Sequence, residues 1–433
     1  MVRFLAQETA SGVLLLLATA TALIWVNLPG EIGESYYQFW ETHVHLTMGD
    51  LNLFNESLVH VVNDALMVLF FFVVGLEIKS ELVDGDLREP RVAALPAIAA
   101  LGGMVIPALI YLTVTSGGEG TNGWGVPMAT DIAFAVGVLA LLGPMVPPRL
   151  KLFLLTLAIV DDIGAILVIA VFYTSGLRYD WLLFAAGLLI AVIALRRLRV
   201  WYIPLYGVVG IVIWYATFRS GVHATIAGVV LGLLAPATPL VGGRAFETFQ
   251  DVLSGDSVNA NKVKDANWQI RESVPITSRL AQLLSPWTSF VIVPTFALAN
   301  AGIEISGGAL ADASGSRITW GIVAGLVIGK IVGVSSFTLL AVRANVASLP
   351  NGVTMLHVVG GGAVAGIGFT VALFIAKLAF VDENGRPLPI QQEAILGILI
   401  ASLLATGLGW LLLRRAAAAV SPPSMAEPVD VRR

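Results

Sequence analysis

The sequence lacks cysteine altogether and has few histidines. With no cysteine among its 433 residues, the chain forms no disulfide bonds, no thiol nucleophile and no cysteine-ligated metal site. Only five residues are histidine, and His43 and His45 are the only close pair, so we expect no transition-metal site. No basic patch suited to nucleic acid is present, and we expect no cofactor.

Charged residues are also scarce. They make up 12% of the chain, whereas soluble domains carry roughly 25%. Apolar residues make up 57%, and the mean hydropathy is +0.85. Together with many apolar stretches of about twenty residues, this composition predicts a protein of the lipid bilayer. The first apolar run, 11–28, is long for a signal peptide and is better explained as a first span.

Hydropathy predicts an all-α polytopic membrane protein with about twelve transmembrane helices. The apolar runs are continuous and lack the period-two alternation of a membrane β-barrel. The predicted spans are 11–28, 59–79, 92–115, 124–142, 150–174, 181–196, 203–218, 222–235, 287–303, 319–342, 354–380 and 391–414.

The distribution of Lys and Arg predicts the orientation. If the N-terminus is inside, nineteen of the 25 Lys and Arg residues lie in inner segments, four in outer loops and two within spans. The positive-inside rule therefore places both termini in the cytoplasm. The expected organisation is spans one to eight in 1–235 with an outer hairpin near 45–54, a cytoplasmic loop in 236–286, spans nine to twelve in 287–416 and a disordered cytoplasmic tail in 417–433.

Two adjacent acids interrupt the fifth span. The stretch "LAIVDDIGAI" (157–166) places Asp161 and Asp162 in an apolar run, where each charge costs about 2.5–3.5 kcal/mol at mid-bilayer. Neighbouring helix residues point about 100° apart, but both can border one cavity at a helix crossing. A single buried acid is also explained by an ion pair that fixes helix packing, or by a carboxyl kept protonated. For an adjacent pair we favour a site that binds protons or a small hard cation such as Na⁺ or Li⁺.

Spans four and eleven contain residues that interrupt a helix. Span four reads "GWGVPMATDIAFA", in which Pro127 removes a backbone donor, and span eleven reads "VVGGGAVAGIGFT", which includes Gly366 and Gly368. Close helix packing by small residues is the alternative for the glycines. Each interruption lies in the middle of three spans, 3–5 and 10–12, a pattern typical of transporters with inverted repeats. Asp131 is suited to neutralise the positive helix ends there, and Lys330 the negative ends.

Several of these segments resemble one family. "NDALMVLFFFVVGLEIK" (63–79), "ATDIAFAVGVLALLG" (129–143), "LAIVDDIGAI" (157–166), "SGVHATIAG" (220–228), "PTFALANAG" (294–302), "IGKIVG" (328–333) and "GIGFT" (366–370) look like the NhaA-type bacterial sodium/proton antiporters. The similarity covers nearly all spans in order. This family is itself a standard example of inverted-topology repeats, so the repeat expectation is not independent of the resemblance.

The resemblance implies a function and a site. It implies crossed, unwound helices four and eleven, and electrogenic export of Na⁺ or Li⁺ in exchange for external protons across the bacterial inner membrane, which serves pH and sodium homeostasis. Asp161 and Asp162 match the ion- and proton-binding pair. Thr130 and Asp131 match the unwound crossing, and Lys330 matches a lysine that pairs with the first aspartate.

The resemblance also implies accessory elements. Asp64, Glu77 and His223 match positions tied to proton access or pH response, although for His223 a structural or modulatory role is favoured over proton carriage. The outer hairpin resembles a dimerisation element, which implies a homodimer.

Two features depart from the family pattern. The stretch before span nine, "RLAQLLSPW" (279–287), lacks the acid and histidines of the family's pH-sensing cluster, and the preceding loop is longer. We therefore expect a pH response that is weaker, shifted or relocated. Lys377 is not part of the pattern, and we expect it to extend its amine toward the membrane surface.

Other classes remain as alternatives. A sodium-coupled symporter for an organic solute needs a larger pocket with solute-binding groups, and no arginine lies near the interrupted helices. A cation channel would use the same acids without alternating access. An intramembrane hydrolase is disfavoured because no serine or histidine pairs convincingly with the aspartates.

Overall fold

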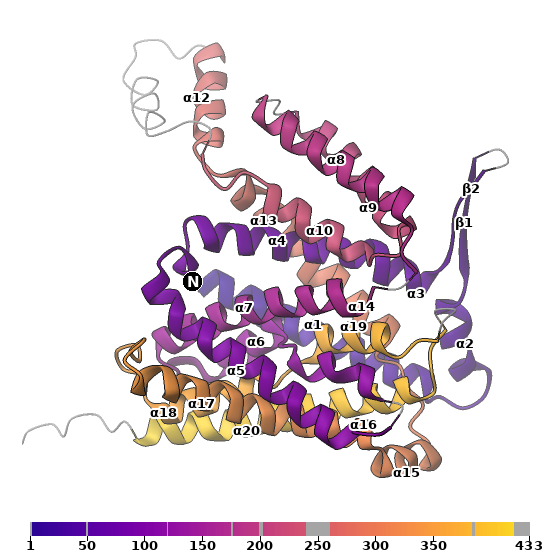
Figure 1. The fold of residues 1–433 in the computed structure, drawn as a ribbon, viewed down its shortest axis with the longest axis vertical. Helices are drawn as coiled ribbons and strands as arrows, with labels where there is room; N and C mark the ends of the chain where they lie inside the picture. Colours follow the sequence, from indigo (N-terminus) through magenta and orange to yellow (C-terminus); the bar gives the residue numbers. More distant parts are fainter. Residues whose placement is uncertain are drawn as a thin grey trace, which may run out of the picture. The chain divides into compact units, whose positions relative to one another are not determined.

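The computed structural model describes residues 2–48, 51–118, 120–174, 176–198, 202–239, 260–382 and 386–419. Over these ranges the chain is mainly helical, with one two-stranded antiparallel sheet (Figure 1). In the described part, eight helices are long and apolar enough to cross a membrane, or up to nine if one bent pair counts as a single span. The expectation of a helical, multi-span membrane protein is therefore confirmed.

The helices follow the apolar runs closely. They are α1 (Val2–Val26), α2 (Glu31–Trp40), α3 (Leu58–Val61), α4 (Met67–Val83), α5 (Pro90–Thr115), α6 (Ile132–Leu142), α7 (Pro148–Phe172), α8 (Tyr179–Arg197), α9 (Ile203–Arg219), α10 (Ala224–Leu234), α12 (Ala260–Glu272), α13 (Ile276–Trp287), α14 (Val293–Asn300), α15 (Gly307–Gly315), α16 (Arg317–Val323), α17 (Lys330–Arg343), α18 (Met355–Ala365), α19 (Phe369–Ala379) and α20 (Ile390–Ala419). The strands are β1 (His43–Met48) and β2 (Leu51–Ser57).

Short turns of other helix types join or interrupt these helices. Three are π-helical: η1 (Val62–Leu66), η5 (Thr288–Ile292) and η6 (Ala324–Gly329). Three are 3₁₀: η2 (Asp86–Arg88), η3 (Thr121–Met128) and η4 (Gly143–Met145). A π turn inserts one extra residue into a helix and often marks a functional position.

Side-chain caps explain where several helices begin. The Ser316 hydroxyl accepts hydrogen bonds from the first backbone N–H groups of α16, at 3.1 Å and 3.3 Å. Thr354 begins α18 in a capping box with His357, whose Nδ1 accepts from the Thr354 backbone N–H at 3.2 Å. Such caps satisfy donors that a helix leaves unpaired at its start.

The chain divides into two compact units that interleave along the sequence. One unit combines Met1–Ala10, Ala94–Asp162 and Ala311–Arg433 and contains the aspartate pair; the other combines Ser11–Ala93 and Ile163–Leu310. We call them the aspartate unit and the hairpin unit.

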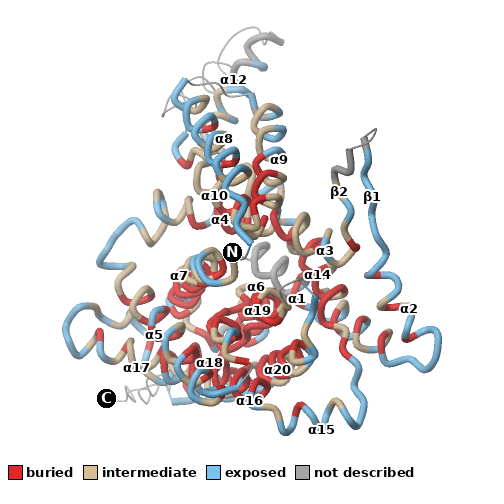
Figure 2. The backbone as a smooth tube through the Cα atoms, turned by 45° about the vertical axis from the view of Figure 1, so that its right-hand side comes forward, coloured by how far each residue is buried: buried red, intermediate tan, exposed pale blue. Residues whose placement is uncertain are grey.

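In the aspartate unit, α18 packs against α17 and α20, and α19 against η3. Every residue from Phe369 to Ala376 of α19 is buried. The α19 tube is accordingly mostly red in Figure 2. Gly102 of α5 and Gly333 of α17 face each other so closely that a Cβ on either would overlap the other's backbone. The core of this unit therefore surrounds the interrupted segments.

In the hairpin unit, α4 packs along α10 through small residues. A Cβ added to Gly75 would lie 2.6 Å from the Val229 carbonyl oxygen, and one added to Gly232 would lie 2.6 Å from that of Phe72. The glycines allow the two backbones to touch, a common device between membrane helices. The β1–β2 hairpin of this unit pairs His43 with Ser57 and His45 with Asn55.

Several boundaries differ from the hydropathy prediction. The helix of predicted span 287–303 already begins at Ile276, and α12 lies within the predicted loop 236–286. The start of α13 has polar residues such as Arg279 and Gln282 on one side and apolar residues on the other. A hydropathy window averages the two sides, so the apolar side is not detected and the predicted span begins too late. Most of the tail 417–433, residues 240–259 of the loop and the turn 49–50 of the hairpin lie outside the described residues.

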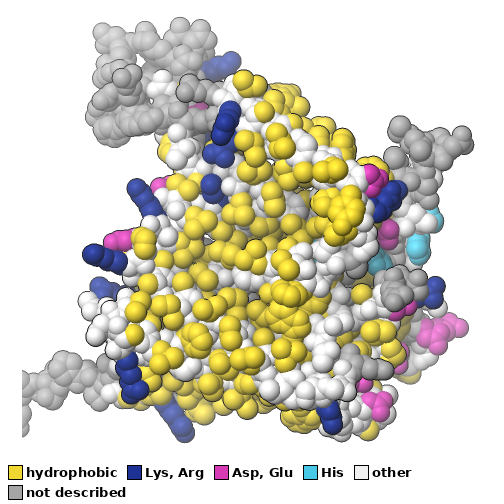
Figure 3. Space-filling view, viewed as in Figure 1, with side chains coloured by type: hydrophobic (Ala, Val, Ile, Leu, Met, Phe, Trp, Pro, Cys, Tyr) yellow, Lys and Arg dark blue, Asp and Glu magenta, His cyan; other side chains and the backbone are white. Residues whose placement is uncertain are grey.

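The surface is consistent with lipid contact. Figure 3 shows hydrophobic side chains over most of the visible face, with comparatively few charged side chains among them. Leu183 of α8 and Leu403 of α20 are 72% and 69% exposed. Large exposed apolar areas are rare on soluble monomers but are required against hydrocarbon.

Candidate functional site

The predicted interruption of span four is present in the structure. The 3₁₀ helix η3 ends at Met128, Ala129 is extended, and α6 begins only at Ile132. Pro127 lies within η3 rather than in the extended break, and its ring packs where a Cβ on Gly325 would otherwise sit.

Span eleven is interrupted in the same way. The helices α18 and α19 are separated by Gly366–Gly368 and bent by 48°. The two breaks lie against each other, since the Asp131 N–H donates to the Ile367 carbonyl oxygen at 2.6 Å. Both interruptions therefore expose helix ends at one place in the buried core.

Asp131 joins the starts of the two half-helices. Its Oδ1 accepts from the Phe134 N–H at 3.0 Å and caps α6. Its Oδ2 accepts from the Thr370 N–H at 3.0 Å and from the Thr370 hydroxyl at 2.7 Å, at the start of α19. A carboxylate at two helix N-termini is stabilised by their partial positive charge. These hydrogen bonds occupy both carboxylate oxygens.

Lys330 reaches the first aspartate of the pair. It follows the π-helical turn η6, and its Nζ lies 2.5 Å from Asp161 Oδ2 and 3.0 Å from Thr130 Oγ1. Both charged side chains are fully excluded from solvent. Lys330 thus lies beside a carboxylate.

The Thr130 hydroxyl lies between these groups. Its Oγ1 is 2.6 Å from Asp161 Oδ2 and 2.8 Å from the Ala365 carbonyl oxygen at the end of α18. A hydroxyl has one proton to donate, so it satisfies only one of these two acceptors at a time. With the Lys330 ammonium donating to Asp161 Oδ2 and the Thr130 hydroxyl donating to the Ala365 carbonyl, these oxygens are satisfied only while the lysine stays in place.

One carboxylate oxygen in this cluster lacks a hydrogen bond. Among the described residues, Asp161 Oδ1 is buried and has no hydrogen-bonding partner. Asp162 follows directly and is 7% exposed. A buried acceptor without a partner is uncommon in native proteins.

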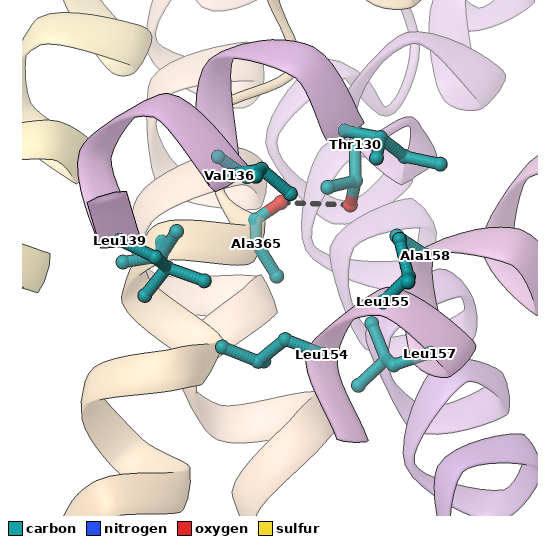
Figure 4. A pocket seen from close by; sticks show the side chains of 11 residues that line it. Thr130, Val136, Leu139, Leu154, Leu155, Leu157, Ala158 and Ala365 are labelled. Carbon is teal, nitrogen blue, oxygen red and sulfur yellow. Dashed lines mark hydrogen bonds between the residues drawn. The ribbon is translucent and has the colours of Figure 1, made fainter. Parts of the chain in front are cut away.

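A small cavity borders Thr130 in the aspartate unit. Its volume is about 10 Å³, which is roughly the space for one water molecule. Figure 4 shows Thr130 and its bond to Ala365 at one side, with Leu139 and Leu154 among the apolar side chains that line the rest. The hydroxyl is the polar side chain of this lining.

The remaining predicted site residues belong to the hairpin unit. Asp64 lies in the π-helical turn η1, and its carbonyl oxygen accepts from Trp214 Nε1 at 2.6 Å. Glu77 lies in α4. His223 precedes α10, and its Nε2 is 2.6 Å from the Tyr173 carbonyl oxygen, a bond that ties two segments together.

The structure adds residues that the sequence prediction missed. Thr370 completes the cap with Asp131, and the Ala365 carbonyl contributes to the oxygen cluster. Thr370 lies at the start of α19, and Thr130 lies just before α6. A threonine at the corresponding place in both interrupted spans is a signal that the sequence contains. Asn63 and Asn300 exchange two amide hydrogen bonds, at 3.2 Å and 2.8 Å, next to Asp64.

A larger cavity in the hairpin unit has a different character. Its volume is about 690 Å³, its lining is mostly apolar, and its charged lining residue is Arg196. It has no carboxylate and is unsuited to a cation.

Comparison with known proteins agrees with the resemblance seen in the sequence. The family model described as Na⁺/H⁺ antiporter 1 matches residues 2–413. A protein of Frankia alni named Na(+)/H(+) antiporter NhaA 3 is 46% identical over 413 residues, which covers 95% of this chain and 87% of the relative. The Na(+)/H(+) antiporter NhaA of Rhodopirellula baltica is 43% identical over 421 residues, covering 95% and 93%. The Na(+)/H(+) antiporter NhaA 2 of Sorangium cellulosum is 46% identical over 429 residues, covering 96% and 90%. The chain has interrupted helices around a buried carboxylate and is similar to these antiporters over nearly its whole length. It is therefore a member of the NhaA family of Na⁺/H⁺ antiporters.

Proposed function

We propose that the protein exports Na⁺, and also Li⁺, in exchange for protons at the cluster formed by Asp161, Asp162 and Thr130. The observation that carries the proposal is the buried Asp161 Oδ1 without a hydrogen bond. Leaving a buried acceptor unpaired costs about 1–3 kcal/mol, and more for a charged group. A bound proton or cation would remove that cost, so this oxygen is suited to exchange one for the other.

The ligands fit a small hard cation. Carboxylate, hydroxyl and carbonyl oxygens are what such ions prefer, and all three kinds occur at Asp161, Thr130 and Ala365. We assign Asp162 as the primary ion ligand and Asp161 as the second carboxylate. Lys330 occupies the position beside Asp161 while no cation is bound, and it withdraws when Na⁺ enters.

Competition between Na⁺ and protons gives exchange. The site opens to the cytoplasm or to the outside, never to both. Because a bound Na⁺ or proton neutralises the acids, either ligand lowers the free-energy cost of switching between these two states inside the membrane. Two carboxylates take up two protons but share one Na⁺. One turnover then moves more positive charge inward than outward, which makes the exchange electrogenic.

Other predicted residues have supporting roles in this scheme. Asp131 stays bound to the starts of α6 and α19 and keeps the half-helices together without carrying ions. Asp64, Glu77 and His223 serve proton access or pH response. The chain contributes to pH and sodium homeostasis of the cell.

We further propose twelve spans with both termini in the cytoplasm, in the bacterial inner membrane. The eight long helices and the bent pair α18–α19 account for nine spans. The apolar helices α1, α9 and α10 supply the other three. Each proposed repeat, spans 3–5 and 10–12, has its interrupted member in the middle. We also propose a homodimer formed through the β1–β2 hairpin.

Transport in everted membrane vesicles tests the proposal. Addition of Na⁺ or Li⁺ should dissipate a preformed pH gradient, reported by a pH-sensitive dye, and Asp162→Asn should abolish the response. Asp180→Asn is the matched control, because that acid is exposed at the start of α8 and should be replaceable without effect. Normal exchange by Asp162→Asn, with wild-type amounts of protein in the membrane, would overturn the assignment.

The pH dependence separates exchange from the alternatives. If Na⁺ and protons compete for one site, the apparent Na⁺ affinity weakens as pH falls while the maximal rate changes less. A channel would show a flux that does not saturate and does not run against a gradient. A symporter would need an organic solute for Na⁺ movement.

A further inference from the structure

Three of the five histidines lie at the base of the β1–β2 hairpin. The antiparallel register pairs His43 with Ser57 and His45 with Asn55. Residues two apart on a strand point to the same face, so both imidazoles stand on one side of the hairpin. His60 follows in α3, and its Nδ1 lies 2.7 Å from the Ser57 hydroxyl.

The two strand imidazoles lie close together. Their ring centroids are 5.9 Å apart, with an angle of 23° between the ring planes. With metal–nitrogen bonds of about 2.0–2.1 Å, two imidazoles on one metal place their centroids roughly 5–6.5 Å apart. Both residues are exposed, and Figure 3 shows histidine side chains on the surface. The rings are stacked nearly parallel, so both must rotate before their in-plane lone pairs can point at one ion, and exposed side chains are free to do so.

A neighbouring amide orients the first ring. His43 Nδ1 lies 3.1 Å from Asn55 Oδ1, and in the tautomer with its proton on Nδ1 the ring donates to this oxygen. The lone pair then resides on Nε2, on the far side of the ring. Metal-ligating histidines commonly donate their other N–H to such an oxygen, which fixes the tautomer and raises the basicity of the ligating nitrogen.

We propose that His43 and His45 form a surface binding site for Zn²⁺ or a similar imidazole-preferring divalent ion. Neutral imidazole is a favoured ligand of zinc, nickel and copper. Among the described residues no group of three or more His, Asp or Glu side chains is arranged to hold a metal, so water completes the coordination. This proposal goes against the expectation from the sequence, which noted His43 and His45 as a close pair but predicted no transition-metal site.

The site lies close in sequence to a segment of the proposed transport pathway. The strand β2 continues directly into α3 and then into η1, which carries Asp64. A metal that bridges His43 and His45 stiffens the start of this connection. The binding proposal does not depend on the proposed antiport, because its test measures metal binding alone.

Isothermal titration of Zn²⁺ tests the site. The full-length protein, purified through an affinity tag without histidines, treated with a chelator and held in detergent micelles, should bind one Zn²⁺ per chain. His43→Gln and His45→Gln should each weaken binding by about tenfold or more, in line with the loss expected when a metal site is altered.

A register variant gives the matched control. His45→Leu combined with Leu46→His keeps the number of histidines but moves one imidazole to the opposite face of β1, so it should bind as weakly as His45→Gln. Copper(II) bound to the wild type should show two coordinating imidazole nitrogens by electron paramagnetic resonance. Undetectable binding by the wild type, or undiminished binding by the register variant, would overturn the proposal.

Discussion

Lys330 Nζ lies 2.5 Å from Asp161 Oδ2, and neither side chain is exposed to solvent. Taking two charges out of water costs free energy that their attraction barely repays, so such a pair is weak evidence for a purely stabilising role. In the exchange proposed above, the lysine provides a replaceable positive charge: Na⁺ or a proton that neutralises Asp161 would release Lys330, and loss of the ligand would bring the lysine back.

Removal of one member of this pair should be costly. Lys330→Met leaves Asp161 buried and uncompensated, and we expect a loss of about 3–5 kcal/mol in the free energy of unfolding. The double variant Lys330→Met with Asp161→Asn has no buried charge at this position and should recover most of that loss. Thermal unfolding of the purified proteins measures both. If the double variant is less stable than Lys330→Met, the two side chains do not act as a pair.

The Thr130 hydroxyl should be needed for cation binding. Thr130→Val keeps the shape but removes the contacts to Asp161 and Ala365, so we expect the Na⁺ concentration at half-maximal exchange to rise about tenfold or more, equivalent to roughly 1.4 kcal/mol. Thr130→Ser should retain wild-type behaviour because it keeps the oxygen. Thr156→Val is a control, since that buried hydroxyl bonds only within its own helix, to Leu152. Equal effects of Thr130→Val and Thr156→Val would contradict the assignment.

The Asp131 cap should contribute to stability. Thr370→Val removes the hydroxyl donor to Asp131 Oδ2 but leaves the backbone donor, so we expect a loss of about 0.5–1.5 kcal/mol. Asp131→Ala removes the caps of α6 and α19 together and should cost at least about twice as much, since one cap contributes roughly 1 kcal/mol. Chemical or thermal unfolding in detergent measures the difference. Two equal losses would show that the backbone bonds of Asp131 contribute little.

The sequence predicted the helical membrane architecture and singled out buried polar residues, for a physical reason. Charges are so costly in a bilayer that Asp131, Asp161, Asp162 and Lys330 stand out by their apolar neighbours alone. Pro127 and the glycines likewise indicated the interruptions, although the extended backbone begins just after that proline. The family resemblance was confirmed by the comparisons.

The distances between helices could not be predicted in this way. Thr130 lies 235 positions before Ala365 in sequence, and hydropathy carries no information about which helices cross. The start of α13 was missed because hydropathy averages over an amphipathic turn. The pairing of His43 with Ser57 and of His45 with Asn55 depends on strand register, which a histidine count does not contain.

Close packing of α4 on α10 should depend on individual glycines. Gly75→Ala would place a methyl group 2.6 Å from the Val229 carbonyl oxygen, so one helix must shift. Overpacking of this kind costs about 1–3 kcal/mol, which we expect as a lower melting temperature of the purified protein. Gly187→Ala in α8 is the matched control. No heavy atom lies within 4 Å of its added Cβ, so it should raise the melting temperature, because alanine favours a helix over glycine by about 1 kcal/mol. If both variants shifted the melting temperature in the same direction, helix propensity rather than the α4–α10 contact would govern the response.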